Sequence, residues 1–293
     1  MRPVCGMITR TMLTGFEKQK KYFEKAILDG GISHAYIFSG PESIGKRMFA
    51  HETYKKLNHR EGEGADGDLR IISPRTTKDG DISTIPVEDI RDLPSFLSLS
   101  SLPGIFRVVI IDNADRLTIG AANALLKTLE EPLPNRVFFL ITSQPEMIPL
   151  TIRSRCHEVR FAPHDDEVIK TQAKLGGFSE EDAEFVSMIA RGRIGLISGL
   201  LNNKSVSELK KDLKDFQQAA KKGIFQRFAF AKTVADSGRA VQLVDLWLSW
   251  ARTRVIATDK APGVIHALIK LSYELSQSQY SERLALERFF LSI

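Results

Sequence analysis

Residues 40–47 read Gly-Pro-Glu-Ser-Ile-Gly-Lys-Arg. The stretch matches G-x-x-x-x-G-K, the pattern of a phosphate-binding loop, whose glycines let backbone N–H groups curl around phosphates and whose lysine reaches the outer phosphates. The working pattern continues with Ser or Thr, and that hydroxyl binds Mg²⁺. Arg47 stands at this position and has no oxygen to offer a metal. The sequence therefore predicts a nucleotide-binding loop that keeps Gly40, Gly45 and Lys46 but has lost part of its chemistry.

The sequence on either side of this loop predicts an α/β fold. Ala35–Ser39 is a short apolar run suited to a buried strand, and helix-forming spacing follows over Lys46–Leu57. Further buried strands are expected at residues 69–73, 107–112, 136–142 and 157–161. Helices are expected at 16–29, at 87–99 with an interruption at Pro94, and at 118–131 with Thr118 as cap. Because strands alternate with helices, we predict a parallel, doubly wound sheet.

Beyond Pro163 every segment with clear periodicity is helical. The expected helices are 164–176, 179–191, 205–222, 224–236, 239–259, 263–278 and 281–292. Residues 202–205, Asn-Asn-Lys-Ser, are typical of a linker. We therefore predict three domains: a nucleotide-binding domain at 1–163, a small helical domain at 164–204 and a terminal helical bundle at 205–293.

The composition is that of an ordinary soluble globular protein, with 43% hydrophobic and 26% charged residues. The net charge of +5 is compatible with a nucleic-acid partner. The sequence shows no secretory signal and no run of the roughly 20 apolar residues that a membrane helix needs. Cys5 and Cys156 are too few for a disulfide framework or a four-thiolate zinc site. We expect no metal site, no membrane partner and a cytoplasmic location.

The strand at 107–112 ends in Asp112, which is followed by Asn113. In an ATPase with such a loop, the first carboxylate at this strand end supports Mg²⁺, and a Glu after it polarises the attacking water. Asp112 fits the metal position, but the amide of Asn113 cannot act as a general base near neutral pH. Asp115 either replaces that base or belongs to the approach to the next helix. Thr142 and Ser143 end the next strand, where a hydroxyl either senses a γ-phosphate or is satisfied within the fold.

Two arginines bracket Ser154 just before the strand at 157–161. An arginine presented at a domain edge can reach a neighbour's nucleotide and accelerate hydrolysis by roughly 10³ to 10⁵. Arg153 and Arg155 are candidates for such an arginine finger, and surface salt bridges are the alternative. Arg193 either contacts phosphate or is a solvated arginine at a helix start. A further set of lysines forms either a solvated helix face or, if aligned on a concave surface, a DNA-binding face. They are Lys210, Lys211, Lys214, Lys221 and Lys222.

Several longer segments carry a resemblance to a known family. They are His-Ala-Tyr-Ile-Phe-Ser-Gly-Pro at 34–41, Val-Ile-Ile-Asp at 109–112, Asn-Ala-Leu-Leu-Lys-Thr-Leu-Glu-Glu-Pro at 123–132, Ser-Arg-Cys at 154–156 and Arg-Leu-Ala-Leu-Glu-Arg-Phe-Phe-Leu at 283–291. Over nearly its whole length the chain resembles the bacterial clamp-loader branch of the AAA+ ATPases. The resemblance implies an AAA+ P-loop domain, a small helical lid domain and a C-terminal helical collar domain that joins subunits.

Within that branch the chain is more similar to the delta-prime subunits of DNA polymerase III than to the tau/gamma subunits. A tau/gamma-like chain would keep Ser or Thr at position 47, Glu at position 113 and an arginine near Gly195. The resemblance therefore implies a degenerate Walker A loop on a subunit that does not hydrolyse ATP. It also implies that Arg155, with Arg153 as second candidate, is the arginine finger for the ATP site of an adjacent tau/gamma subunit.

The same resemblance implies a hetero-oligomer with tau/gamma and delta subunits that acts in DNA replication on the sliding clamp and primer-template DNA. It implies no required cofactor, although Lys46 leaves room for weak ATP or ADP binding without Mg²⁺-dependent hydrolysis. Many relatives carry a four-Cys zinc module between the two nucleotide-binding elements. Because residues 6–155 contain no Cys, we expect no zinc.

Two other functions stay open. An active tau/gamma-like AAA+ clamp-loader ATPase would use Asp115 as its base and would show Mg²⁺-dependent turnover. A free-standing DNA-binding protein would use the basic helices and would show salt-sensitive DNA affinity without partners. Neither alternative explains why three changed site positions occur together with the Ser-Arg-Cys segment.

Overall fold

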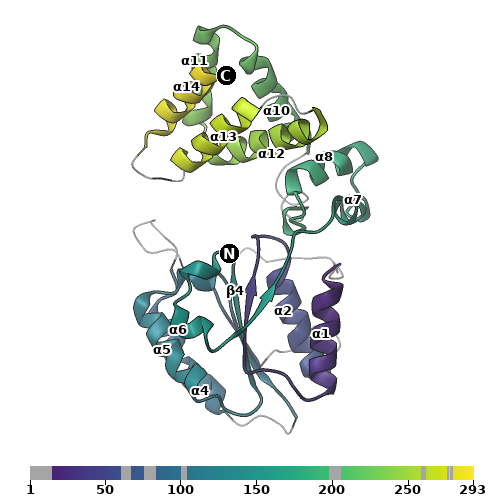
Figure 1. Ribbon diagram of the computed structural model, residues 1–293, viewed down its shortest axis with the longest axis vertical. Coiled ribbons are helices and arrows are strands. Elements are labelled where there is room, and N and C mark those ends of the chain that lie inside the picture. The colour runs from purple at the N-terminus through teal and green to yellow at the C-terminus, as the bar shows by residue number, and fades with distance from the viewer. Residues whose placement is uncertain are drawn as a thin grey trace, which may run out of the picture. The chain divides into compact units, whose positions relative to one another are not determined.

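The computed structural model describes residues 15–60, 67–75, 84–99, 104–197, 206–258, 262–275, 277 and 280–293 (Figure 1). The chain divides into two compact units, Met1–His164 and Asp165–Ile293. Each unit has hydrophobic clusters of its own, and only the first contains described strands. Cys5 and the predicted linker at 202–205 lie outside the described residues.

The first unit is built on a five-stranded sheet of order β2-β3-β4-β1-β5, in which every pairing is parallel. Its strands are β1 (Ala35–Ser39), β2 (Leu69–Ile72), β3 (Arg107–Ile111), β4 (Arg136–Thr142) and β5 (His157–Arg160). β1 and β3 are buried along their whole length, as expected of apolar runs covered on both faces. The predicted α/β fold is confirmed, and each strand lies within one residue of its expected bounds.

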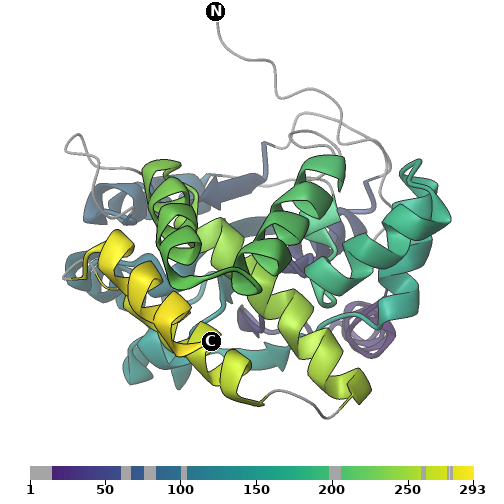
Figure 2. The ribbon, with the colours of Figure 1, turned by 90° about the horizontal axis from the view of Figure 1, so that it is seen from above.

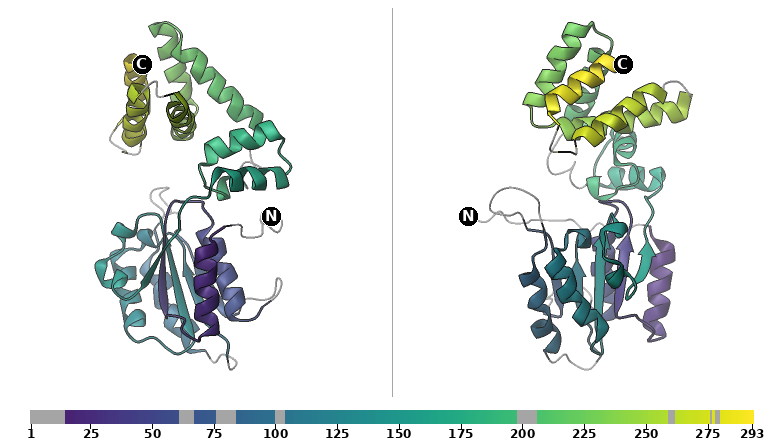
Figure 3. Two further views of the ribbon diagram at one scale, coloured as in Figure 1. Left: turned by 45° about the vertical axis from the view of Figure 1, so that its right-hand side comes forward. Right: turned by 60° about the vertical axis from the view of Figure 1, so that its left-hand side comes forward.

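Helices cover both faces of this sheet (Figures 1 and 3). One face carries α1 (Glu17–Leu28) and α2 (Lys46–Leu57), and the other carries α3 (Val87–Arg91), α4 (Leu93–Ser98), α5 (Ile119–Glu130) and α6 (Leu150–Arg153). Side chains alternate between the two cores along each strand. On β1, Tyr36 and Phe38 join the cluster beneath α1 and α2, while Ala35 and Ile37 join the opposite cluster.

Aromatic rings fix the helix that begins at the loop. The rings of Phe49 on α2 and Phe161 lie 5.1 Å apart in an edge-to-face arrangement. Phe23 of α1 lies 5.6 Å from Phe49 and 4.9 Å from Tyr36 on β1, measured between ring centroids. Each such pair adds about 0.5–1.5 kcal/mol beyond the burial of its area. The first turn of α2, and the loop before it, are therefore held against the end of β1.

The expected interruption near Pro94 lies two residues earlier than predicted. The helical segment breaks at Asp92, between α3 and α4, and Pro94 lies in the first turn of α4. A proline is tolerated in a first helical turn because the N–H that it lacks has no partner inside the helix there. The predicted cap at Thr118 is confirmed, since its side chain accepts a hydrogen bond of 3.2 Å from the N–H of Ala121.

The second unit is helical throughout its described residues (Figure 2). Its named helices are α7 (Asp166–Leu175), α8 (Glu180–Ala190), α10 (Val206–Ala220), α11 (Ile224–Asp236), α12 (Ala240–Thr258), α13 (Pro262–Leu275) and α14 (Glu282–Ser292). Each corresponds to one predicted helix, with bounds that differ by at most three residues. None of the described helices is long and apolar enough to cross a membrane.

Two hydrophobic clusters form the core of this unit. A small cluster joins α7 and α8 through residues such as Ile169 and Val186. A larger cluster joins α10 to α14 around Trp247, whose ring stacks on that of Phe216 at 4.3 Å and lies 6.1 Å from Phe290. The small cluster also contains Val206 of α10, which lies in the predicted collar, and both clusters belong to one compact unit. The boundary between 164–204 and 205–293 therefore stays a prediction.

Candidate functional site

The loop between β1 and α2 has the left-handed backbone that its glycines predict. Gly40 has φ +145°, Gly45 has φ +103°, and Ser43 between them has φ +59°. A Cβ added at Gly40 would lie 2.2 Å from the carbonyl oxygen of Phe161, so a side chain cannot fit there without displacing backbone. The loop is thus a tight turn that opens onto the N-terminus of α2.

Lys46 is the first residue of α2, and its side chain turns back into the loop. Its Nζ donates hydrogen bonds of 2.6 Å to the carbonyl oxygens of both Gly40 and Pro41, and the residue is only 5% exposed. Burial lowers the pKa of this ammonium, and the nearby carboxylates of Glu42, Asp112 and Asp115 act in the opposite direction. The ammonium is therefore enclosed by the loop, where it is positioned for an anion that the loop would hold.

Arg47 and Asp112, which are 65 residues apart in sequence, meet at the carboxyl edge of the sheet. Nη1 of Arg47 lies 3.3 Å from Oδ2 of Asp112, the residue directly after β3. The backbone N–H of Asp112 donates to the carbonyl oxygen of Ile72 at 2.8 Å, which fixes the position of this carboxylate. The side chain of Arg47 is 55% exposed and that of Asp112 is 21% exposed. The carboxylate predicted to support a metal is thus paired with the arginine that replaces a metal ligand.

The remaining predicted groups form a second pair at the same edge. Thr142, the last residue of β4, is buried and donates a hydrogen bond of 2.5 Å to Oδ1 of Asp115, and its Oγ1 accepts one of 2.9 Å from the N–H of Gln144. The other oxygen of Asp115 lies 3.7 Å from Nε of Arg116. Both oxygens of this carboxylate have partners, which argues against its use as a general base. Asn113 adopts a left-handed conformation (φ 51°) before the short turn that contains Asp115.

One contact in the loop was not predicted from sequence. The hydroxyl of Ser143 donates to Oε1 of Glu42 at 3.3 Å, which ties the loop to the end of β4. The two residues are 101 positions apart. No sequence signal could have paired them, because the contact exists only when β4 lies beside β1.

The two candidate finger arginines lie at the other end of the sheet. Arg155 directly precedes Cys156, and β5 begins at His157, which pairs with Tyr36 near the start of β1. Because the strands are parallel, Arg155 lies at the amino edge of the sheet, whereas the loop follows the carboxyl end of β1. The whole length of a strand therefore separates Arg155 from the loop of its own chain.

Arg155 is held in place by three acceptors. Its Nη2 lies 2.8 Å from Oε1 of Glu130 at the end of α5, and Nη1 donates to the carbonyl oxygen of Thr151 at 2.9 Å and to Oγ of Ser154 at 3.4 Å. The side chain is 36% exposed, so part of the guanidinium faces outward. The salt bridge that was the alternative to a finger is thus present in the isolated chain. Sequence reasoning missed Glu130, although it lies in the quoted Leu-Glu-Glu-Pro segment.

Arg153, the second finger candidate, ends α6 and is half-buried, as Arg155 is. It is the last of several groups that lower the pKa of Glu158, after the hydrogen bond from Ser39 and the influence of Arg160. Cys156, the next residue along the chain after Arg155, is also partly buried, and burial raises the pKa of its thiol to about 12.

Most of the basic residues predicted as candidates in the second unit are exposed. Lys210 pairs with Glu181 at 2.7 Å and with Asp182 at 2.9 Å. Nε of Arg193 donates to the carbonyl oxygen of Ala190 at 3.2 Å. The exposed lysines of this set are Lys211, Lys214, Lys221 and Lys222. These contacts satisfy Lys210 and Arg193 within the fold, and a nucleic-acid role for this set stays a prediction.

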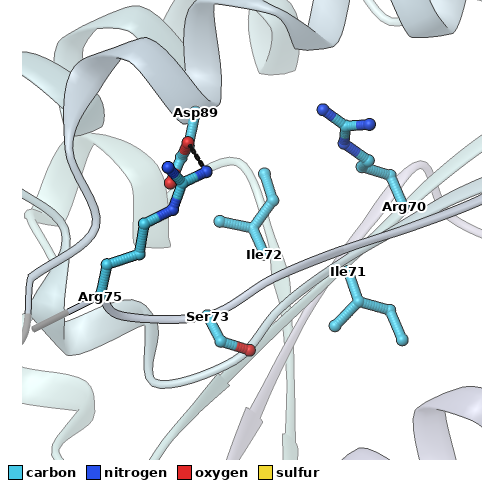
Figure 4. A pocket seen from close by; sticks show the side chains of 6 residues that line it. All are labelled: Arg70, Ile71, Ile72, Ser73, Arg75 and Asp89. Atoms are coloured by element: carbon cyan, nitrogen blue, oxygen red, sulfur yellow. Dashed lines mark hydrogen bonds and ion pairs between the residues drawn. The ribbon is translucent and has the colours of Figure 1, made fainter. Parts of the chain in front are cut away.

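A small hollow of about 230 Å³ lies beside the edge strand β2 (Figure 4). Arg75 and Asp89 form an ion pair at one side of it, and Arg70 lies on the same face of the strand as Ile72. Arg75 and Asp89 satisfy one another at this site. Among the described residues no group of three or more His, Cys, Asp or Glu side chains gathers as a metal site.

Fold and loop together define the class of this protein. A parallel sheet of order β2-β3-β4-β1-β5 with a phosphate-type loop after β1, followed by a helical region, is the architecture of an AAA+ protein. A crystal structure of a DNA polymerase III gamma subunit-related protein from Thermotoga maritima matches 94% of this chain and 97% of its own, with a TM-score of 0.57. The sequence identity is 18%, so this likeness shows the fold alone.

The family follows from sequence. The family described as DNA polymerase III, delta subunit, matches residues 15–165, just over half of the chain, and the chain belongs to it. The tau subunits of Bacillus subtilis and Escherichia coli are 35% and 38% identical to it over 182 and 152 residues, and the delta-prime subunit of Pseudomonas aeruginosa is 35% identical over 136 residues. The predicted resemblance to this branch is confirmed.

These matches leave much of the relatives uncovered. They include 59%, 49% and 42% of this chain, but only 31%, 24% and 42% of the B. subtilis, E. coli and P. aeruginosa proteins, respectively. The chain therefore spans less than half the length of the curated relatives it matches. The match to the family, residues 15–165, falls almost entirely on the unit that carries the sheet and the loop.

Proposed function

We propose that this chain is a delta-prime-type clamp-loader subunit, which does not hydrolyse ATP and supplies Arg155 to the ATP site of a neighbouring tau/gamma subunit. The observation that carries the proposal is the position of Arg155 at the amino edge of the sheet, opposite the carboxyl edge that carries the chain's own loop. An arginine so placed acts on a nucleotide only when the nucleotide belongs to another subunit.

The state of the loop supports the non-hydrolysing part of the proposal. Arg47 offers no hydroxyl for Mg²⁺ and pairs with Asp112, and the amide of Asn113 cannot activate water. Asp115 is bound to Thr142 and lies beside Arg116, so it is poorly placed to replace the missing base. The loop glycines and Lys46, which would bind phosphate, are retained at the carboxyl edge, whereas the hydroxyl for Mg²⁺ and the general base are absent. Weak binding of ATP or ADP without hydrolysis fits this pattern.

The surface around Arg155 supports the finger role. The same segment exposes apolar side chains, since Leu150 is 75% exposed and Met147 is also exposed. Exposed apolar groups beside a partly free guanidinium favour contact with another protein surface. Glu130 and the carbonyl of Thr151 hold Arg155 in one orientation, which reduces the loss of rotamer freedom when the finger docks.

The second unit supports assembly. Several large apolar side chains are exposed on its last helices, although its core is already filled. They are Phe225, Ile269, Tyr273, Leu284 and Leu291. A surface of this kind suits a collar of packed subunits, with tau/gamma and delta as partners. Through them the chain would act on the sliding clamp and primer-template DNA in the cytoplasm.

An active tau/gamma-like ATPase is the second candidate, because tau subunits are among the most similar relatives and Lys46 and Asp112 remain in place. It predicts Mg²⁺-dependent turnover by the isolated chain that Lys46→Ala abolishes. The first candidate predicts no such turnover.

The test of the finger is ATP turnover by a complex reconstituted from this chain, its tau/gamma and delta partners, clamp and primed DNA. We expect Arg155→Ala to lower turnover at the adjoining site by about 10³ or more, in a complex that still assembles. Arg160→Ala is the matched control, since Arg160 is an exposed arginine on β5 with only a surface ion pair. Unchanged turnover in assembled Arg155→Ala complexes would leave the chain a structural subunit at most.

A further inference from the structure

The residues at the cation position of the loop do not fit a divalent metal. AAA+ nucleotide sites use a hydroxyl from the loop and a carboxylate after the neighbouring strand to hold Mg²⁺. Here the loop offers a guanidinium instead of a hydroxyl, and that guanidinium lies 3.3 Å from the carboxylate oxygen that would support the metal. A metal at Asp112 would have to displace Arg47 and would then lie beside its positive charge.

We propose that Arg47 is a built-in replacement for this cation, so that the loop takes the polyphosphate of a nucleoside di- or triphosphate without a divalent metal. The inference rests on the proposed non-hydrolysing, nucleotide-binding loop. A tethered guanidinium supplies positive charge and N–H donors, but it cannot order a water molecule for attack as a hydrated metal can. Arg47 in place of the hydroxyl residue therefore retains polyphosphate binding but removes the metal's part in hydrolysis.

The charges at this edge explain why a replacement is needed. Without a cation, the Asp112 carboxylate would repel an incoming phosphate. Its pairing with Arg47 cancels that charge, while the carboxylates of Glu42 and Asp115 are engaged by Ser143 and Thr142. Lys46 then lies in the loop beside the N–H groups at the start of α2.

The geometry of Arg47 also suits a phosphate. It is the second residue of α2, its side chain is 55% exposed, and Nη1 is the atom paired with Asp112, so Nε and Nη2 can face a ligand in the loop while that pair stays intact. A guanidinium binds phosphate oxygens through two parallel N–H groups, a geometry that a single ammonium does not offer. Lys46 and Arg47 would thus contact the polyphosphate from adjacent positions.

The test is the affinity of the isolated chain for fluorescent N-methylanthraniloyl ADP and ATP, measured by anisotropy with excess Mg²⁺ and with EDTA. We expect the dissociation constants of wild type in the two conditions to agree within about threefold. Arg47→Thr restores a hydroxyl and frees Asp112, so we expect its binding to become at least about tenfold tighter with Mg²⁺ than with EDTA. Arg70→Thr, which changes an exposed arginine on β2, is the matched control and should behave as wild type.

A second readout follows the metal directly. With nucleotide present, electron paramagnetic resonance of Mn²⁺ should show no protein-bound ion in wild type and a bound ion in Arg47→Thr. Wild-type binding that requires Mg²⁺, or no wild-type binding in either condition, would overturn the inference. Either failure leaves the finger untouched, because that role is measured on Arg155 in the assembled complex.

Discussion

The two edges of the parallel sheet differ in the functional residues that they retain. At the carboxyl edge the loop has its glycine backbone and its lysine, but Arg47 and Asn113 stand where a metal ligand and a base would be. At the amino edge Arg155 is held by Glu130 and Thr151 and still faces solvent in part. The comparison shows that a fold can lose its own chemistry at one edge while it presents a group for another subunit's chemistry at the other.

The largest effect at the carboxyl edge should come from Gly40→Ala. The new Cβ would lie 2.2 Å from the carbonyl oxygen of Phe161, on a backbone with φ +145°. We expect the free energy of unfolding to fall by about 4 kcal/mol or more, as measured by chemical denaturation.

Gly30→Ala is the control for this prediction. Gly30 has φ +64° and no neighbour within 4 Å of an added Cβ, so about 1–2 kcal/mol is expected. Equal losses in the two variants would show that the loop backbone is not constrained by packing.

Thr142→Val separates a structural role at this edge from a nucleotide-sensing role. The change leaves the Asp115 carboxylate and the N–H of Gln144 without their partner, and we expect a loss of about 1–3 kcal/mol in unfolding free energy. Ser143→Ala, which removes only an exposed hydrogen bond to Glu42, should change stability by less than about 0.5 kcal/mol. A Thr142→Val chain as stable as wild type would argue that this hydroxyl is not part of the fold's support.

At the amino edge, Glu130→Ala should weaken the finger without removing it. Arg155 would lose its ion pair and sample more orientations, so we expect ATP turnover at the adjoining site to fall by about tenfold. Glu130→Gln retains a hydrogen-bond acceptor and should recover much of this loss. Glu131→Ala, an exposed acidic neighbour, is the control. If Glu130→Ala and Glu131→Ala behave alike, Glu130 does not position Arg155.

The smallest effect concerns the thiol beside the finger. Burial raises the pKa of Cys156 to about 12, so almost no thiolate exists at pH 8, and alkylation by iodoacetamide should be slow in the folded protein. In a Cys5→Ser background, the rate should rise many-fold after denaturation. Rapid alkylation of the folded chain would indicate that Cys156 is a reactive group rather than a packing residue.

The features of the fold that are encoded by short segments were predictable from the sequence. The loop, the strand before it, the helix after it and the cap at Thr118 each depend on neighbouring residues, and the structure has them where the pattern predicts. Pro94 predicted the position of the helix break less exactly. A proline is accommodated in a first helical turn, and the break lies at Asp92.

The side-chain pairs at the two edges of the sheet were not predictable from short segments. Arg47 pairs with Asp112, Asp115 with Thr142 and Glu130 with Arg155, and each pair joins residues 25 or more positions apart. Such pairs depend on the strand order, which no periodicity specifies. The position of Arg155 opposite the loop likewise follows only from the direction of β5 beside β1.

The most direct test of the central claim is to compare the two edges in one reconstituted complex. ATP turnover would be measured with wild type, Lys46→Ala and Arg155→Ala forms of this chain, with assembly verified for each. The account predicts that Lys46→Ala leaves turnover unchanged, while Arg155→Ala lowers it by about 10³ or more at the adjoining site. Loss of turnover with Lys46→Ala, and none with Arg155→Ala, would contradict it and show that the chain is itself an ATPase.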